Sequence, residues 1–335
     1  MSDSRRVRPR FSLWLPGVLV ITVGLGVAYQ AAATATDMRR YPPPGQLVEI
    51  SAEGRSLRLH LQCLGSGSPT VVLEGGQGGL SSDWAWVQPQ VAQTTRVCAY
   101  DRAGVGWSDP GPPPRDARQI TQELHALLGQ ARVPSPYVLV GHSYGGLYVR
   151  TYVGSYPAEV AGVVLVDASH PDQWDRSASA QEQFTFTERM YGVARPLTRV
   201  GLLRLVTYNR VHPDLPAEPG AQHKAVADTT KYVDTAAEEF STSTATNHQV
   251  RSAGNLGGKP LFVLSATGHG SAPDLERVEA GLQRELATLS SDSVHQIVEG
   301  ADHSSLLIKE HDARVTASSI LAVVAAVRGG RALAR

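Results

Sequence analysis

Short apolar runs alternate with segments of helical spacing along most of this 335-residue chain. The runs that predict strands are residues 46–50, 56–63, 70–73, 96–100, 137–140, 163–166, 260–265 and 294–298. The first two runs alternate apolar and polar positions around Ala52-Glu53-Gly54, which predicts an antiparallel hairpin. Helical segments are expected at about residues 117–131, 146–153, 274–289 and 312–327. Strands alternating with helices indicate a parallel sheet covered on both faces, which binds ligands beyond the carboxyl ends of its strands.

This alternation stops between residues 170 and 258. Helical segments at about 179–191 and 196–208 replace it, and the second has apolar spacing at Val200, Leu203 and Val206. Few β-runs occur in the same stretch. We therefore expect a helical insertion over the end of the sheet and not a second domain with its own core.

The N-terminal region carries a long apolar stretch, because residues 11–29 contain no charge. These 19 residues just suffice to span a hydrocarbon core and exceed the usual apolar length of a secretory signal. Arginines at positions 5, 6, 8 and 10 favour a cytoplasmic N-terminus and an exported body. The small residues at 31–35 leave a cleaved signal open, but the length favours a membrane anchor.

The composition limits which partners and cofactors we expect for this chain. The chain has 31 basic and 31 acidic side chains, so its net charge gives no reason to expect nucleic acid as a partner. It has two cysteines, too few for a metal-binding cysteine cluster. We expect neither a cofactor nor a metal.

The segment YVLVGHSYGG at 137–146 carries the clearest chemical signal. It places a G-x-S-x-G motif between an apolar strand and a helix, the context in which a serine becomes a nucleophile. Gly141 and Gly145 permit the sharp turn, which forces Ser143 into strained dihedrals. The N–H of Tyr144 then lies at a helix N-terminus and is a candidate donor to an oxyanion.

Two further loops follow predicted strands. Residues 74–79 read EGGQGG, and bare amides in such a loop are what an oxyanion needs; Gly76 and Gln77 are the candidate donors. Asp101 and Arg102 follow the next strand. Such a charged pair more often holds a loop beneath a site than takes part in catalysis.

Taken together, these motifs resemble the α/β-hydrolase superfamily over about residues 46–327. The segments that carry the resemblance are LEGGQGG at 73–79, YDRAGVGWSD at 100–109, VGHSYGG at 140–146, LVDASHP at 165–171 and EGADHSS at 299–305. The resemblance implies a mostly parallel eight-stranded sheet flanked by helices, with a helical cap between strands six and seven.

The expected organisation follows from this resemblance and from the N-terminal pattern. It is an anchor or signal segment over residues 1–36, a Pro-rich linker over 37–45, a hydrolase core over 46–169 and 259–328, and a helical cap over 170–258.

The resemblance also assigns a histidine and an acid. His303 follows the last strand, where the family keeps its catalytic histidine. The commonest acid position, just after strand seven, holds no carboxylate in residues 265–270. Some members carry the acid after strand six, where this chain has Asp167. Asp274 stays as the alternative acid, although an Asp at a helix start most often caps it.

These residues predict a serine hydrolase that cleaves an ester-type bond of a small or lipid-like substrate through an acyl-enzyme. An Asp nucleophile would have indicated a dehalogenase or an epoxide hydrolase. A cofactor-free perhydrolase or haloperoxidase-like activity, an aminopeptidase-like activity and a non-catalytic binding protein stay open as alternatives. The expected location is the membrane with the catalytic domain outside the cytoplasm, or the medium if the N-terminal segment is cleaved. The sequence names neither the substrate nor the oligomeric state.

The sheet order that the resemblance implies makes the strands of Cys63 and Cys98 neighbours. A disulfide then forms only if the two residues pair directly with their side chains on one face. An exported body favours such a bond, whereas two lone cysteines are often just buried apolar residues. The register decides between the two, and the sequence does not show it.

Overall fold

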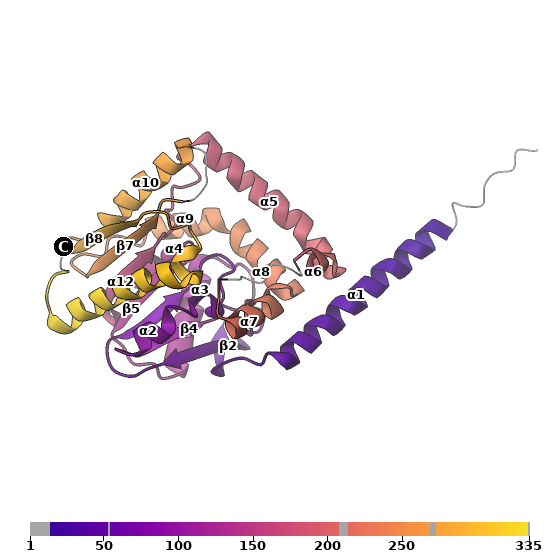
Figure 1. Ribbon diagram of the computed structural model, residues 1–335, viewed down its shortest axis with the longest axis horizontal. Coiled ribbons are helices and arrows are strands. Elements are labelled where there is room, and N and C mark those ends of the chain that lie inside the picture. The colour runs from indigo at the N-terminus through magenta and orange to yellow at the C-terminus, as the bar shows by residue number, and fades with distance from the viewer. Residues whose placement is uncertain (1–13, 53, 208–213, 269–272, 334–335) are drawn as a thin grey trace, which may run out of the picture.

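The computed structural model describes residues 14–52, 54–207, 214–268 and 273–333 of the chain. Its centre is an eight-stranded sheet in the order β1-β2-β4-β3-β5-β6-β7-β8 (Figure 1). The strands are β1 (Gln46–Ala52), β2 (Arg55–Leu64), β3 (Thr70–Glu74), β4 (Val97–Tyr100), β5 (Tyr137–His142), β6 (Val160–Val166), β7 (Leu261–Ala266) and β8 (Ser293–Val298). Strand β2 runs antiparallel to β1 and β4, and the remaining pairs are parallel. The predicted mostly parallel sheet is confirmed.

Helices cover both faces of this sheet. One face packs against α3 (Ala117–Gln130), α4 (Gly145–Ser155) and α10 (Pro273–Ala287). The other packs against α2 (Gln88–Ala92), α11 (Ser305–Ile308) and α12 (Glu310–Gly329). Strands β3, β5 and β7 are buried at every position, which explains their continuous apolar runs. Because the six strands from β3 to β8 are parallel, the loops that follow them gather at one edge.

A helical insertion, called the cap below, lies between β6 and β7. Its helices are α5 (Ala178–Arg199), α6 (Leu202–Thr207), α7 (Ala217–Ala227), α8 (Thr230–Ser241) and α9 (Ser243–Arg251). Helix α5 is longer than the expected segment 179–191 and contains Pro196 within its last turn. Residue 208, the end of the second expected helix, lies outside the described residues.

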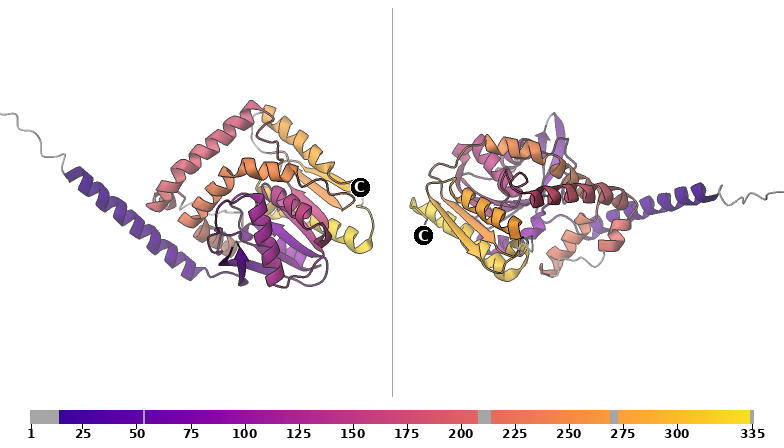
Figure 2. Two further views of the ribbon diagram at one scale, coloured as in Figure 1. Left: turned by 180° about the vertical axis from the view of Figure 1, so that it is seen from behind. Right: turned by 90° about the horizontal axis from the view of Figure 1, so that it is seen from above.

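Helix α1 (Trp14–Arg40) projects from the body, as Figures 1 and 2 show. It continues past residue 29 because the alanine-rich stretch that follows favours a helix. In the described part of the chain it is the one helix long and apolar enough to cross a membrane. The arginines at positions 5–10 and residues 11–13 lie outside the described residues.

The second half of α1 is bound to the cap. The side chain of Gln30 is buried and donates a hydrogen bond to the carbonyl of Asp228, at 2.7 Å. Asp37, two turns further on, forms an ion pair with Arg204 of α6. Polar contacts therefore fix the direction in which the exposed apolar half of α1 leaves the body.

The two cysteines form a disulfide. Cys63 of β2 and Cys98 of β4 are direct partners in the antiparallel ladder, and their sulfur atoms are bonded. The register thus meets the condition that the sequence left open. The bond connects the two strands that flank the chain segment containing the glycine-rich loop after β3.

Candidate active site

Ser143 lies in the sharp turn between β5 and α4 with a φ of 53°, in the left-handed region. The turn has no room for side chains at the flanking glycines. A Cβ on Gly141 would lie 2.5 Å from the carbonyl oxygen of Gly145, and one on Gly145 would lie 2.4 Å from that of Glu74. The Ser143 carbonyl accepts a hydrogen bond from the Ser169 N–H at 2.9 Å, which ties the turn to the loop after β6. A strained serine is therefore held in place by its neighbours.

Asp167 and His303 meet at the carboxyl edge of the sheet. Asp167 directly follows β6, is 4% exposed and has a φ of 42°. One carboxylate oxygen lies 2.6 Å from Nδ1 of His303, and the other accepts the Ala266 N–H at 3.1 Å. His303 lies in the loop after β8. Because Nδ1 faces the carboxylate, Nε2 is the ring nitrogen on the side away from Asp167.

The alternative acid has a different environment. Asp274 lies in the first turn of α10, where its carboxylate accepts a hydrogen bond from the Ser179 hydroxyl at 2.7 Å. That bond, together with backbone N–H groups of the helix start, holds the pKa of Asp274 below its usual value. Asp274 therefore connects α10 to the cap helix α5.

The glycine-rich loop lies directly beside the serine. A Cβ on Gly76 would lie 3.0 Å from the Cβ of Ser143. Arg102 binds the carbonyls of Gly75 and Gly76, at 2.9 and 2.6 Å. In a trans peptide the next N–H points opposite to the carbonyl, so the N–H groups of Gly76 and Gln77 point away from Arg102. Within the described residues, the N–H groups of Gln77 and Tyr144 have no acceptor.

Arg102 is itself held by two buried carboxylates. It pairs with Glu74 at 2.6 Å and with Glu239 of cap helix α8 at 2.8 Å. Burial alone would lower the pKa of Arg102, but these carboxylates raise it well above its ordinary value. Glu239 also accepts the N–H of Gly78, at 3.0 Å. The cap is therefore bound to the glycine-rich loop through a charge network.

The neighbouring Asp101 stabilises a second loop. Burial would raise its pKa, but hydrogen bonds from His60 and from the N–H groups of Ser81 and Trp107 lower it. Asp101 and Arg102 are both buried beneath the site and hold loops, as their sequence context predicts.

Glu239 is a residue that the sequence analysis missed. It lies on the buried face of α8 with Ala236 and Phe240. A carboxylate on the apolar face of an amphipathic helix is the signal that could have identified it, because such a group needs a charged partner.

His142, inside the serine turn, supports the loop of His303. Its Nε2 donates to the His303 carbonyl at 2.9 Å, and the two rings lie 4.6 Å apart. Burial, with the nearby His303, lowers the pKa of His142 to about 4. His142 is therefore neutral at pH 7 and makes the local hydrogen bond expected of it.

A cavity of about 310 Å³ adjoins these groups, and Ser143, Asp167 and His303 all line it. Its wall comes from the cap and from α10. The apolar lining includes Trp174, Phe240, Leu275 and Val278, and the polar lining includes Gln77, Gln173, Gln183 and Gln283. The cavity thus suits a small ligand with both apolar and hydrogen-bonding parts.

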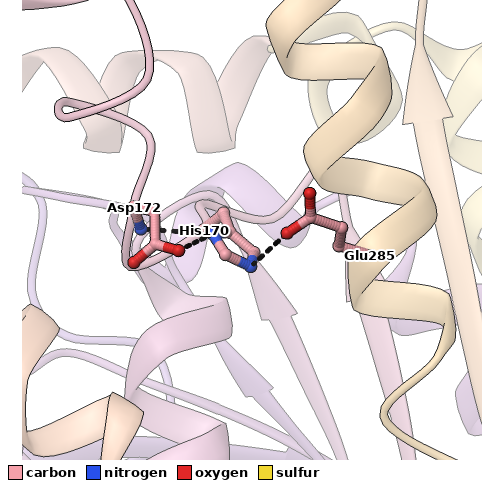
Figure 3. A group of neighbouring side chains, drawn as sticks. All are labelled: His170, Asp172 and Glu285. Carbon is pink, nitrogen blue, oxygen red and sulfur yellow. Dashed lines mark hydrogen bonds and ion pairs between the residues drawn. The ribbon is translucent and has the colours of Figure 1, made fainter.

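His170, another histidine at a strand end, belongs to a separate cluster with Asp172 and Glu285 (Figure 3). Its ring nitrogens lie 3.8 Å from the Asp172 carboxylate and 3.7 Å from that of Glu285. Arg176 pairs with both carboxylates, and Arg251 pairs with Asp172. Because arginines already compensate the acidic charge, we interpret the cluster as an ion-pair network joining the loop after β6 to α9 and α10.

Comparison with known proteins identifies the family. A family model described as the alpha/beta hydrolase fold matches residues 69–270, more than half of the chain. The chain belongs to the alpha/beta hydrolase fold family. The resemblance inferred from the motifs and the fold class expected from it are thereby confirmed.

Curated relatives of this alpha/beta hydrolase are distant. It is 29% identical over 258 residues to a probable transporter, efuK, of Hormonema carpetanum, covering 72% of this chain and 34% of that protein. It is 34% identical over 153 residues to an uncharacterised protein of Schizosaccharomyces pombe, covering 37% and 28%. It is 31% identical over 105 residues to an AB hydrolase superfamily protein of Gibberella zeae, covering 30% and 33%. The chain spans about a third of the length of these relatives.

Solved structures share the fold at low identity. An esterase from Thermogutta terrifontis, bound to malate, superposes with a TM-score of 0.60 at 19% identity, covering 82% of this chain and 96% of that one. The Cif epoxide hydrolase from Acinetobacter nosocomialis reaches 0.68 at 15% identity, covering 88% and 96%. At these identities the likeness concerns the fold alone.

Proposed function

We propose that the protein is a serine hydrolase that cleaves an ester-type bond through Ser143, His303 and Asp167. The observation that carries the proposal is the 2.6 Å contact of His303 Nδ1 with Asp167, on the cavity that the strained Ser143 also lines. Buried Asp167 orients the imidazole and stabilises its cationic form. The contact of Asp167 with His303 supports Asp167 as the acid over Asp274, whose carboxylate accepts a hydrogen bond from Ser179.

The reaction proceeds in two acyl-transfer steps. His303 Nε2 takes the hydroxyl proton of Ser143 while the serine oxygen attacks the substrate carbonyl. The imidazolium then gives this proton to the leaving alcohol, which departs and leaves an acyl-enzyme. A water molecule attacks the acyl group with His303 as base, and the proton returns to the serine as the acid is released.

The developing oxyanion is stabilised by backbone amides. The N–H groups of Tyr144 and of Gly76 or Gln77 are the donors, and Arg102 orients the glycine-rich loop from behind. Arg102 is thus a positioning residue, because its guanidinium is buried and its hydrogen bonds go to carbonyls and carboxylates.

The substrate is a small or lipid-like ester. The volume of the cavity admits a short acyl group or a compact leaving group, with Trp174 and Phe240 on its apolar side. A serine nucleophile supports acyl transfer over epoxide opening, even though an epoxide hydrolase shares the fold. Perhydrolysis differs only in the attacking molecule, which is hydrogen peroxide in place of water.

The test is a chain-length series of p-nitrophenyl esters against the full chain in detergent, run with and without hydrogen peroxide. We expect hydrolysis with a clear optimum of acyl length, and none with Ser143→Ala. Peracid as the main product would instead indicate a perhydrolase. Failure to turn over any ester would contradict the proposal.

We further propose that α1 is an uncleaved membrane anchor that holds the catalytic domain outside the cytoplasm. The contacts of its second half support this, since cleavage within residues 31–35 would remove buried Gln30 from Asp228. The full chain should pellet with membranes, and a chain starting at Tyr41 should be soluble. A mature chain in the medium beginning near residues 34–37 would show a cleaved signal instead.

A further inference from the structure

The cap presents an apolar stripe to the outside. Phe186, Met190 and Val193 of α5 are each at least half exposed, and their spacing of i, i+4 and i+7 places them on one helix face. Gln183 and Thr187 of the same helix line the active-site cavity, and Gln183, three residues before Phe186, lies on the flank next to this stripe. Helix α5 therefore carries both an edge of the cavity and an exposed apolar stripe.

Helix α6, which follows α5 in the chain, also exposes apolar side chains. Leu202, Leu205 and Val206 are 47%, 62% and 71% exposed, again at i, i+3 and i+4. Arg204, between them in sequence, points the other way and is 9% exposed, with hydrogen bonds to Gln30 and Thr34 of α1. The polar contacts of Arg204 thus fix the apolar side of α6 outward.

The turn between α5 and α6 touches α1 inside its uncharged stretch. A Cβ on Gly26 would lie 2.5 Å from the carbonyl oxygen of Val200, and one on Gly201 would lie 2.7 Å from the ring of Tyr29. Because a helix rises about 1.5 Å per residue, Gly26 lies about 4.5 Å before Tyr29, the last residue of the apolar run 11–29, which polar Gln30 follows. If α1 crosses a bilayer, this turn lies at the boundary between headgroups and acyl chains.

The direction of the helices agrees with this placement. In Figure 1, α5 runs across the direction of α1, and the two meet where α6 begins. In the same view, the side of α5 that is turned away from the other cap helices is the side to which the N-terminal half of α1 projects. The view from above in Figure 2 shows α5 and α1 following one line. A bilayer crossed by α1 would therefore lie along the outer face of α5.

We propose that this outer cap face (Phe186, Met190, Val193, Leu202, Leu205 and Val206) is a second membrane contact, embedded in the interface of the bilayer that α1 crosses. The inference rests on the proposed anchor and goes beyond it, since an anchored domain can equally stand clear of the membrane. Lipid is what contacts this face, because the contacts of Gly26 and Tyr29 connect it with the exposed apolar side chains of α1. Apolar helix faces that lie in this way are buried about 5–10 Å into the boundary region.

A consequence concerns the substrate. With α5 on the bilayer, the cavity beneath it lies next to the lipid phase, where an apolar ester concentrates. The cap contact thus deepens the proposed function by favouring esters that partition into the membrane.

The test measures how deep chosen residues of the full chain lie in vesicles of phosphatidylcholine and phosphatidylglycerol. Single cysteines replace Leu205, Val20 or Ser318 and carry an environment-sensitive NBD fluorophore. The native cysteines are bonded to each other and do not react without reductant. Val20 reports on the anchor, and exposed Ser318 on α12 is the control in water. Lipids with a nitroxide at a shallow or a deep acyl carbon act as quenchers.

We expect the shallow nitroxide to quench the Leu205→Cys probe several-fold more than the Ser318→Cys probe, and the deep nitroxide to quench the Val20→Cys probe. If the probe at position 20 is quenched but the probe at 205 is quenched no more than the probe at 318, the cap contact is overturned and the anchor stands. No quenching at position 20 would reject both. A probe at 205 that shifts to the blue but does not respond to lipid quenchers would mean that protein covers the face, which also overturns the proposal.

Discussion

Replacing Asp167 by asparagine tests how the histidine is held. Asparagine has nearly the same shape, and its oxygen can still accept the Ala266 N–H, now 3.1 Å from the carboxylate. Its NH₂ group would then face Nδ1 of His303, where a carboxylate oxygen now lies at 2.6 Å. Nδ1 must then accept, which places the imidazole proton on Nε2. In that tautomer the ring cannot take the proton of Ser143.

The expected loss follows from this tautomer change. Loss of the correct tautomer in a serine triad costs about 10⁴ in kcat. At about 1.36 kcal/mol per tenfold change, this corresponds to about 5.4 kcal/mol of transition-state stabilisation. Asp274→Asn is the matched control, because it makes the same chemical change where the partner is the hydroxyl of Ser179. A hydroxyl can donate or accept, so this variant should lose no more than a few-fold.

The assay compares kcat for a p-nitrophenyl ester at pH 7.5 among the native chain and the two variants, with circular dichroism to confirm that each is folded. A larger loss in Asp274→Asn would transfer the role of the acid to Asp274. A loss below about tenfold in Asp167→Asn would refute the reasoning about the tautomer.

Two predictions concern the support of the site. Glu239→Gln should lower the free energy of unfolding by about 3–5 kcal/mol, because it removes one partner of the buried ion pair with Arg102. Urea unfolding measures this loss, with the neighbouring Glu238→Gln as the control. An equal loss in the control variant would contradict the prediction. The pKa of His142 is lowered from 6.5 to about 4, so the folded state loses stability as the pH falls from 6.5 toward 4, by up to about 3 kcal/mol. His142→Gln, which keeps an N–H donor for the His303 carbonyl, should unfold with a weaker pH dependence over this range, and an unchanged dependence would contradict the assignment.

Local patterns predict most of the hydrolase core. The continuous apolar runs of β5 and β6 mark strands buried on both faces. The glycines around Ser143 mark its turn, because their Cβ atoms would clash with backbone. These features depend on residues close together in the sequence, and a pattern of spacing can record them.

Contacts between distant segments are not readable in this way. Asp167 and His303 are 136 residues apart, so only the packed sheet shows which carboxylate faces the imidazole. The pairing of Cys63 with Cys98 depends on strand register, which the alternation of apolar residues did not fix. Glu239 was missed because its partner Arg102 lies 137 residues away in another layer of the fold.

Covalent labelling of the nucleophile tests the central proposal most directly. The full chain in detergent is treated with a fluorophosphonate and its intact mass is measured, with Ser143→Ala and Ser169→Ala as variants. Ser169 lines the same cavity and serves as the matched control. We expect one added probe on the native chain and on Ser169→Ala, located on the peptide that contains Ser143, and none on Ser143→Ala. Undiminished labelling of Ser143→Ala would contradict the assignment of Ser143 as the nucleophile.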